Sequence, residues 1–270
     1  MKISFSTLGC PGWSWDDILS TARDLGFDGI EVRGVENELY VPKAVPFLEK
    51  NAIATIERLK KLRLEIPTIT SACYLFDGEN SEANLKEGMD YIALADRLGV
   101  PYVRVLGDRN PEPGKNVDLG LVAENLRKLD KFAAGKGVML LVESNGVLAN
   151  SDTMLELLKT AGCSNTGVLW DVHHPFRYYG EPVMKTWSVL KEYIKFVHIK
   201  DSIVKDGKIK YKMMGHGDVP VKEALILLKN GGYIGFVSLE WVKRWCMDLE
   251  EPGVVFSHFV NYVKSILDQE

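Results

Sequence analysis

The chain has 270 residues, of which 46% are hydrophobic and 26% charged, a composition typical of a globular protein with a substantial core. Its formal net charge of −4 argues against a surface that binds nucleic-acid phosphates or anionic membranes. No stretch approaches the roughly 18–20 consecutive apolar residues of a membrane span. We therefore expect a cytoplasmic protein with neither nucleic-acid nor membrane partners.

Short apolar segments, each the length of one buried strand, recur along the chain. They are residues 2–7, 29–34, 65–73, 102–107, 138–144, 167–172, 196–201 and 236–241. Segments with helical periodicity alternate with them, and most end in glycine, which commonly terminates a helix: 15–26, 51–62, 84–99, 121–137, 151–162, 221–232 and 256–267. This alternation predicts a single (β/α)8 TIM barrel domain over residues 1–270.

A doubly wound open sheet is the competing fold. Such a sheet usually has a glycine-rich phosphate loop after its first strand. The segment that follows here, "STLGCPGW", does not contain GxGxxG. The barrel is therefore the favoured prediction.

Four successive predicted strands carry metal-binding residue types at their ends. The fifth strand ends with Glu143, the sixth ends with Asp171, the seventh carries His198 and the eighth ends with Glu240. Active sites of these barrels lie at the C-terminal ends of the strands, and closure of the barrel directs the four side chains toward one axis. Three carboxylates and one imidazole without a thiolate suit Mn²⁺, Co²⁺, Zn²⁺, Mg²⁺ or Fe²⁺. We expect one divalent metal ion of unspecified identity.

The strand-end set, with His174 three residues after Asp171, resembles that of the xylose isomerase-like TIM barrel superfamily. Within it, the similarity is to the sugar phosphate isomerase/epimerase group, which includes tagatose/psicose 3-epimerases, inosose dehydratases and apurinic endonucleases. The segments "DLGFDGIEVRG" (24–34) and "GHGDVP" (215–220) extend the resemblance over essentially the whole chain.

The resemblance implies a metal-dependent isomerase or epimerase that acts on a ketose, a sugar phosphate or a related polyol. The metal would act as a Lewis acid on a carbonyl oxygen and stabilise an enediolate. Glu143 and Glu240 would be metal ligands and also catalytic acid and base, exchanging a carbon-bound proton. His174 would form a hydrogen bond to a substrate oxygen.

Other polar residues near the strand ends are candidates for substrate binding. Asn145 is predicted either to donate to a substrate hydroxyl or to stabilise its loop. Lys200 and Asp201 would orient His198, bind a substrate anion or form a surface ion pair. Arg33 and Arg104 would bind an anionic substrate or pair with barrel carboxylates. If 171–173 continues a strand, His173 points to the same side as Asp171, and its role stays open.

Tryptophans follow the first and last predicted strands: Trp13, Trp15, Trp241 and Trp245. We expect some of them, Trp13 first, to form an apolar wall that shields a bound sugar from water. The others would pack between loops.

The sequence departs from the tagatose/psicose epimerases in two ways. After the seventh strand it offers lysines rather than their arginine, and "ESNGVLAN" lacks their acidic residue. An inosose dehydratase-like lyase is therefore an alternative.

An apurinic endonuclease is less favoured, because "TSACYLF" and "VLGDRNP" lack the histidines that enzyme needs at strands three and four. A non-catalytic metal- or sugar-binding barrel and a homo-oligomer also stay open.

Overall fold

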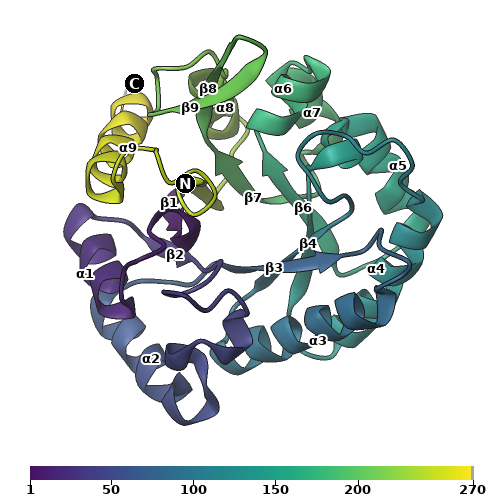
Figure 1. Cartoon of the computed structure of the whole chain (residues 1–270), viewed down its shortest axis with the longest axis horizontal. Coiled ribbons are helices and arrows are strands. Elements are labelled where there is room, and N and C mark those ends of the chain that lie inside the picture. Colours follow the sequence, from purple (N-terminus) through teal and green to yellow (C-terminus); the bar gives the residue numbers. More distant parts are fainter. Residues whose placement is uncertain (269–270) are drawn as a thin grey trace.

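The computed structural model describes residues 1–268 and arranges eight parallel strands into one barrel (Figure 1). The strands are β1 (Lys2–Ser6), β2 (Gly29–Glu31), β3 (Thr68–Tyr74), β4 (Tyr102–Leu106), β5 (Met139–Glu143), β6 (Thr166–Asp171), β7 (Ile194–Ile199) and β10 (Phe236–Leu239). Their order around the sheet is β2-β1-β10-β7-β6-β5-β4-β3. Isolated parallel bridges from Gly29 to Glu65 and from Val32 to Ile69 join β2 to the β3 side. The predicted (β/α)8 fold is confirmed.

Helices surround the barrel (Figure 1). They are α1 (Trp15–Leu25), α2 (Glu49–Leu62), α3 (Ser81–Leu98), α4 (Leu119–Ala134), α5 (Ser151–Ala161), α7 (Val183–Leu190), α8 (Val221–Asn230) and α9 (Pro252–Leu267). Gly26 and Gly99 end α1 and α3 with φ of 76° and 68°, a left-handed conformation that glycine adopts without steric cost. No helix in the described part of the chain is long and apolar enough to cross a membrane.

Some elements escaped the sequence prediction because they are short or lack a clear period. Two helices, α6 (His173–Tyr179) and α7, follow β6 in a part of the chain where no helical segment was predicted. The hairpin of β8 (Asp201–Lys205) and β9 (Lys208–Lys212) follows β7. Short 3-10 turns, η1 (Thr7–Gly9), η2 (Val41–Lys43), η3 (Val45–Phe47) and η4 (Gly146–Ala149), lie in the loops.

A small apolar cluster lies below the predicted site residues on the same strands. It consists of Leu141, Leu169, Phe196 and Phe236, which are buried. The first three each precede a predicted site residue by two positions. Because side chains alternate along a strand, each points to the same side of the sheet as its site residue. The interior therefore has an apolar layer beneath a polar layer at the strand ends.

Candidate metal centre

The four predicted metal ligands come together at one end of the barrel. One ligand atom each from Glu143, Asp171, His198 and Glu240 can be chosen so that all lie within 4.8 Å of one another. Parallel pairing sets Asp171 directly opposite His198, while Glu143 ends β5 and Glu240 follows β10 by one residue. Asp171 and His198 have no exposed surface. Burying several carboxylates together is unfavourable without compensating positive charge.

Glu31, at the end of β2, fixes the orientation of the His198 imidazole. Its Oε2 lies 2.9 Å from His198 Nε2 and accepts a hydrogen bond of 2.7 Å from Ser238 Oγ. The other ring nitrogen, Nδ1, then faces the cluster, 3.5 Å from Glu240 Oε1 and 3.9 Å from Asp171 Oδ2. Burial opposes protonation, but Glu31 and Glu240 prevail and raise the pKa of His198 to about 9. A carboxylate that holds a histidine in this way is common behind metal ligands.

Sequence reasoning missed Glu31, although a signal was present. The segment "GIE" ends the second strand with a carboxylate, as the fifth and sixth strands do. The four predicted ligands come from the fifth to eighth strands, whereas Glu31 reaches His198 from β2, on the other side of β1.

Lys200 lies inside the cluster rather than at its edge. Its ammonium contacts Asp171 Oδ2 and Glu240 Oε2, and its side chain is 1% exposed. Burial favours the neutral amine, yet these two carboxylates hold the pKa of Lys200 well above its usual range. Lys200 therefore supplies positive charge where a metal ion was predicted.

The donor set fits a divalent ion. Glu143 Oε2 and His198 Nδ1 are buried and have no hydrogen-bond partner within residues 1–268, and the nearest cation to Glu143 Oε2 is Arg104, whose Nε lies 3.3 Å away. The Lys200 ammonium shows that the cluster already accommodates a cation. Oxygen and imidazole donors match the preferences of Mg²⁺, Mn²⁺ and Zn²⁺.

The two glutamates of the cluster differ in their electrostatic surroundings. Burial raises the pKa of Glu143 and outweighs the opposing charge of Arg104, whose Nε lies 3.3 Å from Glu143 Oε2. Burial acts in the same direction on Glu240, but Lys200 and His198 overcome it and hold that pKa well below its usual range. One carboxyl group is thus biased toward the protonated form and the other toward the ionised form.

His174 lies against the cluster from the first turn of α6. Its Nδ1 is 3.1 Å from the Ser144 carbonyl, which can only accept, so Nδ1 carries the proton. Its Nε2 lies 3.5 Å from Asp171 Oδ2. Burial lowers the pKa of His174 to about 4, so the ring is neutral at pH 7. A neutral imidazole with a free Nε2 can accept a hydrogen bond from a hydroxyl group.

His173 is not placed as strand alternation predicted, because β6 ends at Asp171 and the helix α6 begins at His173. Its Nε2 lies 2.9 Å from Ser202 Oγ, and its ring centre is 5.7 Å from that of Tyr211. It does not line the cavity over the cluster. His173 therefore joins α6 to the hairpin.

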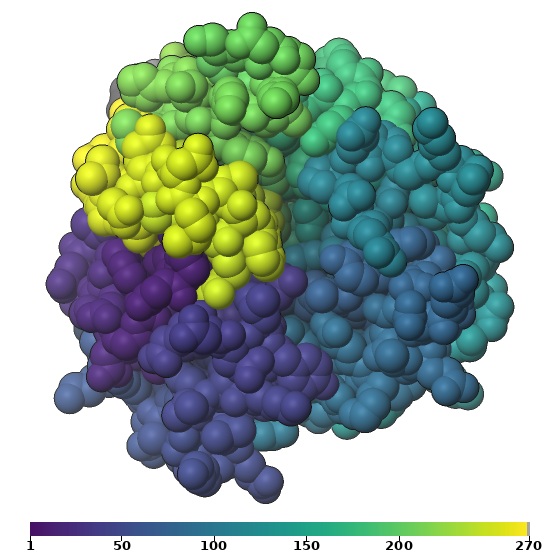
Figure 2. Space-filling view, viewed as in Figure 1, coloured from purple at the N-terminus to yellow at the C-terminus, as the bar shows by residue number. Residues whose placement is uncertain are grey.

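A cavity of about 230 Å³ opens over the cluster. Its polar and aromatic lining consists of Arg33, Tyr74, Arg104, Arg109, Glu143, Asn145, His174, Lys200, Tyr211, Glu240 and Trp245. This volume lies below the roughly 300–1,000 Å³ typical of sites for drug-sized ligands and suits a small sugar. Figure 2 shows one face of the molecule, hollowed near the barrel axis beside the yellow C-terminal segment.

Several remaining predicted residues have structural contacts. Asn145 lines the cavity, and its Nδ2 donates to the carbonyls of Asp108 at 3.2 Å and Asn110 at 3.1 Å. Both loop-stabilising and substrate-binding roles are compatible with that position. Asp201 faces away from the cluster and accepts backbone N–H bonds from Gly215 and Gly217. It anchors the Gly-x-Gly loop rather than orienting His198.

The tryptophans divide between the cavity and the core. Trp245 lines the cavity. Trp13 does not; it packs edge-on against Phe256, with ring centres 5.7 Å apart. Trp241 is fully buried and donates through Nε1 to the Glu250 carbonyl. Of the four tryptophans, some of which were expected to form an apolar wall, only Trp245 lines this cavity.

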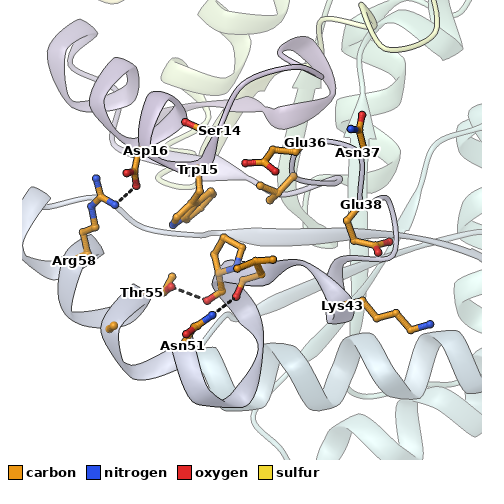
Figure 3. Close-up of a pocket in the computed structure, with 14 residues that line it drawn as sticks. Ser14, Trp15, Asp16, Glu36, Asn37, Glu38, Lys43, Asn51, Thr55 and Arg58 are labelled. Atoms are coloured by element: carbon orange, nitrogen blue, oxygen red, sulfur yellow. Dashed lines mark hydrogen bonds and ion pairs between the residues drawn. The ribbon is translucent and has the colours of Figure 1, made fainter.

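A second cavity, of about 700 Å³, lies outside the barrel between α1, α2 and the loop after β2 (Figure 3). Trp15 lines it, and Arg58 pairs with Asp16 across its margin (Figure 3). None of the four cluster residues lines this cavity. The chemistry-bearing residues gather in the smaller cavity at the strand ends.

Fold and site together define a (β/α)8 barrel with a buried, oxygen-rich candidate metal centre. The model of the xylose isomerase-like TIM barrel family matches residues 19–255, and the chain belongs to that family. Among curated proteins, none matches this sequence significantly.

Solved structures with the same fold include enzymes and a metal complex. The probable 3-DHS dehydratase AsbF from Bacillus anthracis has a TM-score of 0.79 at 18% identity, covering 98% of this chain and 99% of its own. D-psicose 3-epimerase from Clostridium cellulolyticum H10, solved with D-tagatose, has a TM-score of 0.77 at 17% identity, covering 99% of both chains. A xylose isomerase-like barrel protein from Mycobacterium smegmatis, solved with magnesium, has a TM-score of 0.73 at 19% identity. The match covers 98% of this chain and 96% of that protein. At these identities the likeness establishes the fold alone.

Proposed function

We propose that the protein is a divalent-metal-dependent isomerase or epimerase of a ketose, sugar phosphate or related polyol. The observation that carries the proposal is geometric: Glu143 and Glu240 line one cavity and gather with Asp171 and His198, one ligand atom from each lying within 4.8 Å of the others. Both belong to one buried cluster, and their pKa values are displaced in opposite directions. Two titratable groups whose surroundings separate their pKa values are typical of an acid–base pair.

Glu143, Asp171, His198 and Glu240 are the residues that would hold the ion. When bound, the ion supplies Lewis-acid polarisation of a substrate carbonyl. The ligand set contains no thiolate, and Glu31 holds the His198 ring with Nδ1 toward the cluster.

The chain's own groups account for proton transfer. Glu240, held ionised, removes the proton from the carbon beside the substrate carbonyl. The electron pair of that C–H bond forms the new C=C bond, and the carbonyl π pair moves onto oxygen. Glu143, biased toward its protonated form, delivers a proton to the opposite face of the same carbon while the C=O bond re-forms. The product is the epimer, and proton equilibration between the carboxyls and solvent restores the starting state.

Lys200 and His174 would position the substrate. The Lys200 ammonium beside Glu240 is a donor to the oxygen that gains charge, and His174 Nε2 is an acceptor for a neighbouring hydroxyl. Both residues line the same cavity as the two glutamates, which supports these roles.

A lyase is the second candidate, favoured by the raised pKa of Glu143. A protonated carboxyl beside a base can protonate a leaving hydroxyl on the adjacent carbon, and water is then lost instead of the proton being returned. The choice between the two depends on the substrate.

The test is a screen of ketoses, ketose phosphates and inososes with Mn²⁺- or Co²⁺-loaded protein, alongside metal analysis. The proposal expects about one ion per chain and turnover that E240Q lowers by roughly 10²–10⁴-fold. Formation of an epimer or isomer supports the first candidate, and formation of a dehydrated product supports the lyase. Protein that retains no divalent ion and turns over none of these compounds would contradict both.

A further inference from the structure

The cavity over the cluster has a second charged region, built from arginines. Arg104 lies within β4, and Arg33 lies two residues beyond β2. Both line the cavity together with Tyr74, which ends β3 between these two strands. The arginine region meets the carboxylate cluster where Arg104 Nε lies 3.3 Å from Glu143 Oε2.

The Arg104 guanidinium is buried but poorly satisfied. Its side chain is 7% exposed, and the contact with Glu143 is its one ion pair within residues 1–268. Its Nε has no hydrogen-bond partner there. A guanidinium offers a planar fork of N–H donors, and burying such donors without acceptors is unfavourable. The geometry leaves room for an acceptor on the cavity side.

Arg33 has even fewer partners. It is partly buried, and in the described residues no carboxylate lies within 4.0 Å of its guanidinium and no acceptor is hydrogen-bonded to it. Burial and the charge of Arg104 lower the pKa of Arg33. Glu87 is near enough to attract it weakly, but Glu87 Oε1 already accepts a hydrogen bond from the Ala72 backbone N–H.

Two guanidiniums therefore line one small cavity, and a single carboxylate, that of Glu143, pairs with one of them. The hydroxyls of a neutral sugar would satisfy some N–H donors but would leave the positive charge unbalanced. A carboxylate or a phosphate would satisfy the N–H donors and also balance the positive charge. Such a group accepts paired hydrogen bonds from a guanidinium and carries the opposite charge.

We infer that the substrate carries an anionic group, a carboxylate or a phosphate, that Arg33 and Arg104 bind at one end of the cavity. The carbonyl end of the same molecule would then lie at the carboxylate cluster. This inference rests on the proposed function, because it names the substrate class of that same site. Arg109, at the exposed margin, pairs with Asp77 at 3.5 Å and so is already partly neutralised.

Isothermal titration calorimetry on full-length, Mn²⁺-loaded protein tests the inference with three probes of similar size. They are D-fructose, D-fructose 6-phosphate and D-fructuronate. We expect at least one anionic probe to bind about 10-fold or more tightly than D-fructose, and the stronger of the two identifies the anion. R33Q should reduce that affinity by about 10-fold while changing the affinity for D-fructose less than about 2-fold.

Two further variants isolate the role of Arg33. R33K keeps the charge but loses the fork and should retain part of the affinity for the anion. R97Q, at an exposed position near the end of α3, makes the same change in net charge and should bind all three probes like wild type. D-fructose binding as tightly as both anions, or R33Q weakening all three probes equally, would overturn the inference.

Turnover separates this inference from the proposed function. If an anionic probe binds in an Arg33-dependent way but is not converted, and no other ketose is converted, the anion subsite stands and the proposed function fails. If D-fructose is epimerised by wild type and R33Q at equal rates with no preference for the anions, the function stands and the subsite fails.

Discussion

Glu31 and His198 lie on β2 and β7, 167 residues apart in sequence, with 2.9 Å between Glu31 Oε2 and His198 Nε2. The contact fixes which ring nitrogen faces the candidate metal centre. Because the other three residues of the cluster are carboxylates, the orientation of this ring decides whether the cluster offers a nitrogen donor.

Replacing Glu31 should weaken metal binding although Glu31 is not itself a ligand. In E31Q the ring loses its charged partner, and we expect divalent-ion affinity to fall by about 10–100-fold. Competition with a fluorescent chelator measures the change. E82Q removes an exposed carboxylate from α3 and should bind the ion like wild type. Equal affinity in E31Q and E82Q would show that Glu31 does not position His198.

Lys200 should act as an internal competitor for the ion. In K200M the carboxylates of Asp171 and Glu240 lose their buried cation, so metal-free protein should be about 3–5 kcal/mol less stable than wild type. Metal should recover more stability in K200M than in wild type, because no ammonium beside Asp171 and Glu240 repels the ion. Denaturant unfolding with and without Mn²⁺ measures both quantities. An identical metal-induced gain in the two proteins would contradict competition.

His174 should make the protein sensitive to acid. Its pKa is about 4 in the folded protein and 6.5 is the ordinary value, so the unfolded chain takes up a proton that the folded protein excludes. Its contribution to stability is therefore full above pH 6.5 and is lost as pH falls toward 4. Between pH 6.5 and 5 the loss is about 2 kcal/mol.

Denaturant unfolding at these two pH values checks the expectation by comparison with H174Q. That variant should lose about 2 kcal/mol less than wild type over the interval. H216Q replaces an exposed histidine of the Gly-x-Gly loop and should keep the wild-type pH dependence. The same pH dependence in H174Q and wild type would contradict the assignment.

Asp201 should hold the Gly-x-Gly loop against the barrel. Its carboxylate accepts N–H bonds of 3.0 Å from Gly215, 2.8 Å from Gly217 and 3.2 Å from Val219. D201N should cost about 1–3 kcal/mol, because an amide replaces a charged acceptor. Hydrogen exchange of residues 213–219 should accelerate in D201N and stay unchanged in D206N, at the exposed hairpin turn. If hydrogen exchange of residues 213–219 were equally slow in D201N and wild type, contacts other than those of Asp201 would hold the loop in place.

The sequence predicted the barrel because its alternation of apolar strands and amphipathic helices is a local property of the chain. Strand-end positions also predicted which side chains gather into the cluster, since closure of a parallel barrel brings those ends together. The contact of Glu31 with His198 depends on the packing of β1 and β10 between them and has no local signature.

Lys200 and His173 show where strand alternation holds and where it fails. Lys200 follows His198 by two residues and, as alternation predicts, reaches the same cluster, where it contacts Asp171 and Glu240. For His173 the alternation fails, because β6 ends at Asp171 and α6 begins at His173. Where a strand ends depends on the tertiary contacts of the next segment.

Solvent deuterium uptake tests proton transfer at this cluster most directly. Wild-type protein and E240Q, each loaded with Mn²⁺, are incubated in heavy water with a ketose that the wild type converts. The recovered sugar should carry deuterium on the carbon next to the carbonyl after incubation with wild type, and essentially none after incubation with E240Q. Conversion without deuterium uptake, or equal uptake with the two proteins, would contradict the account.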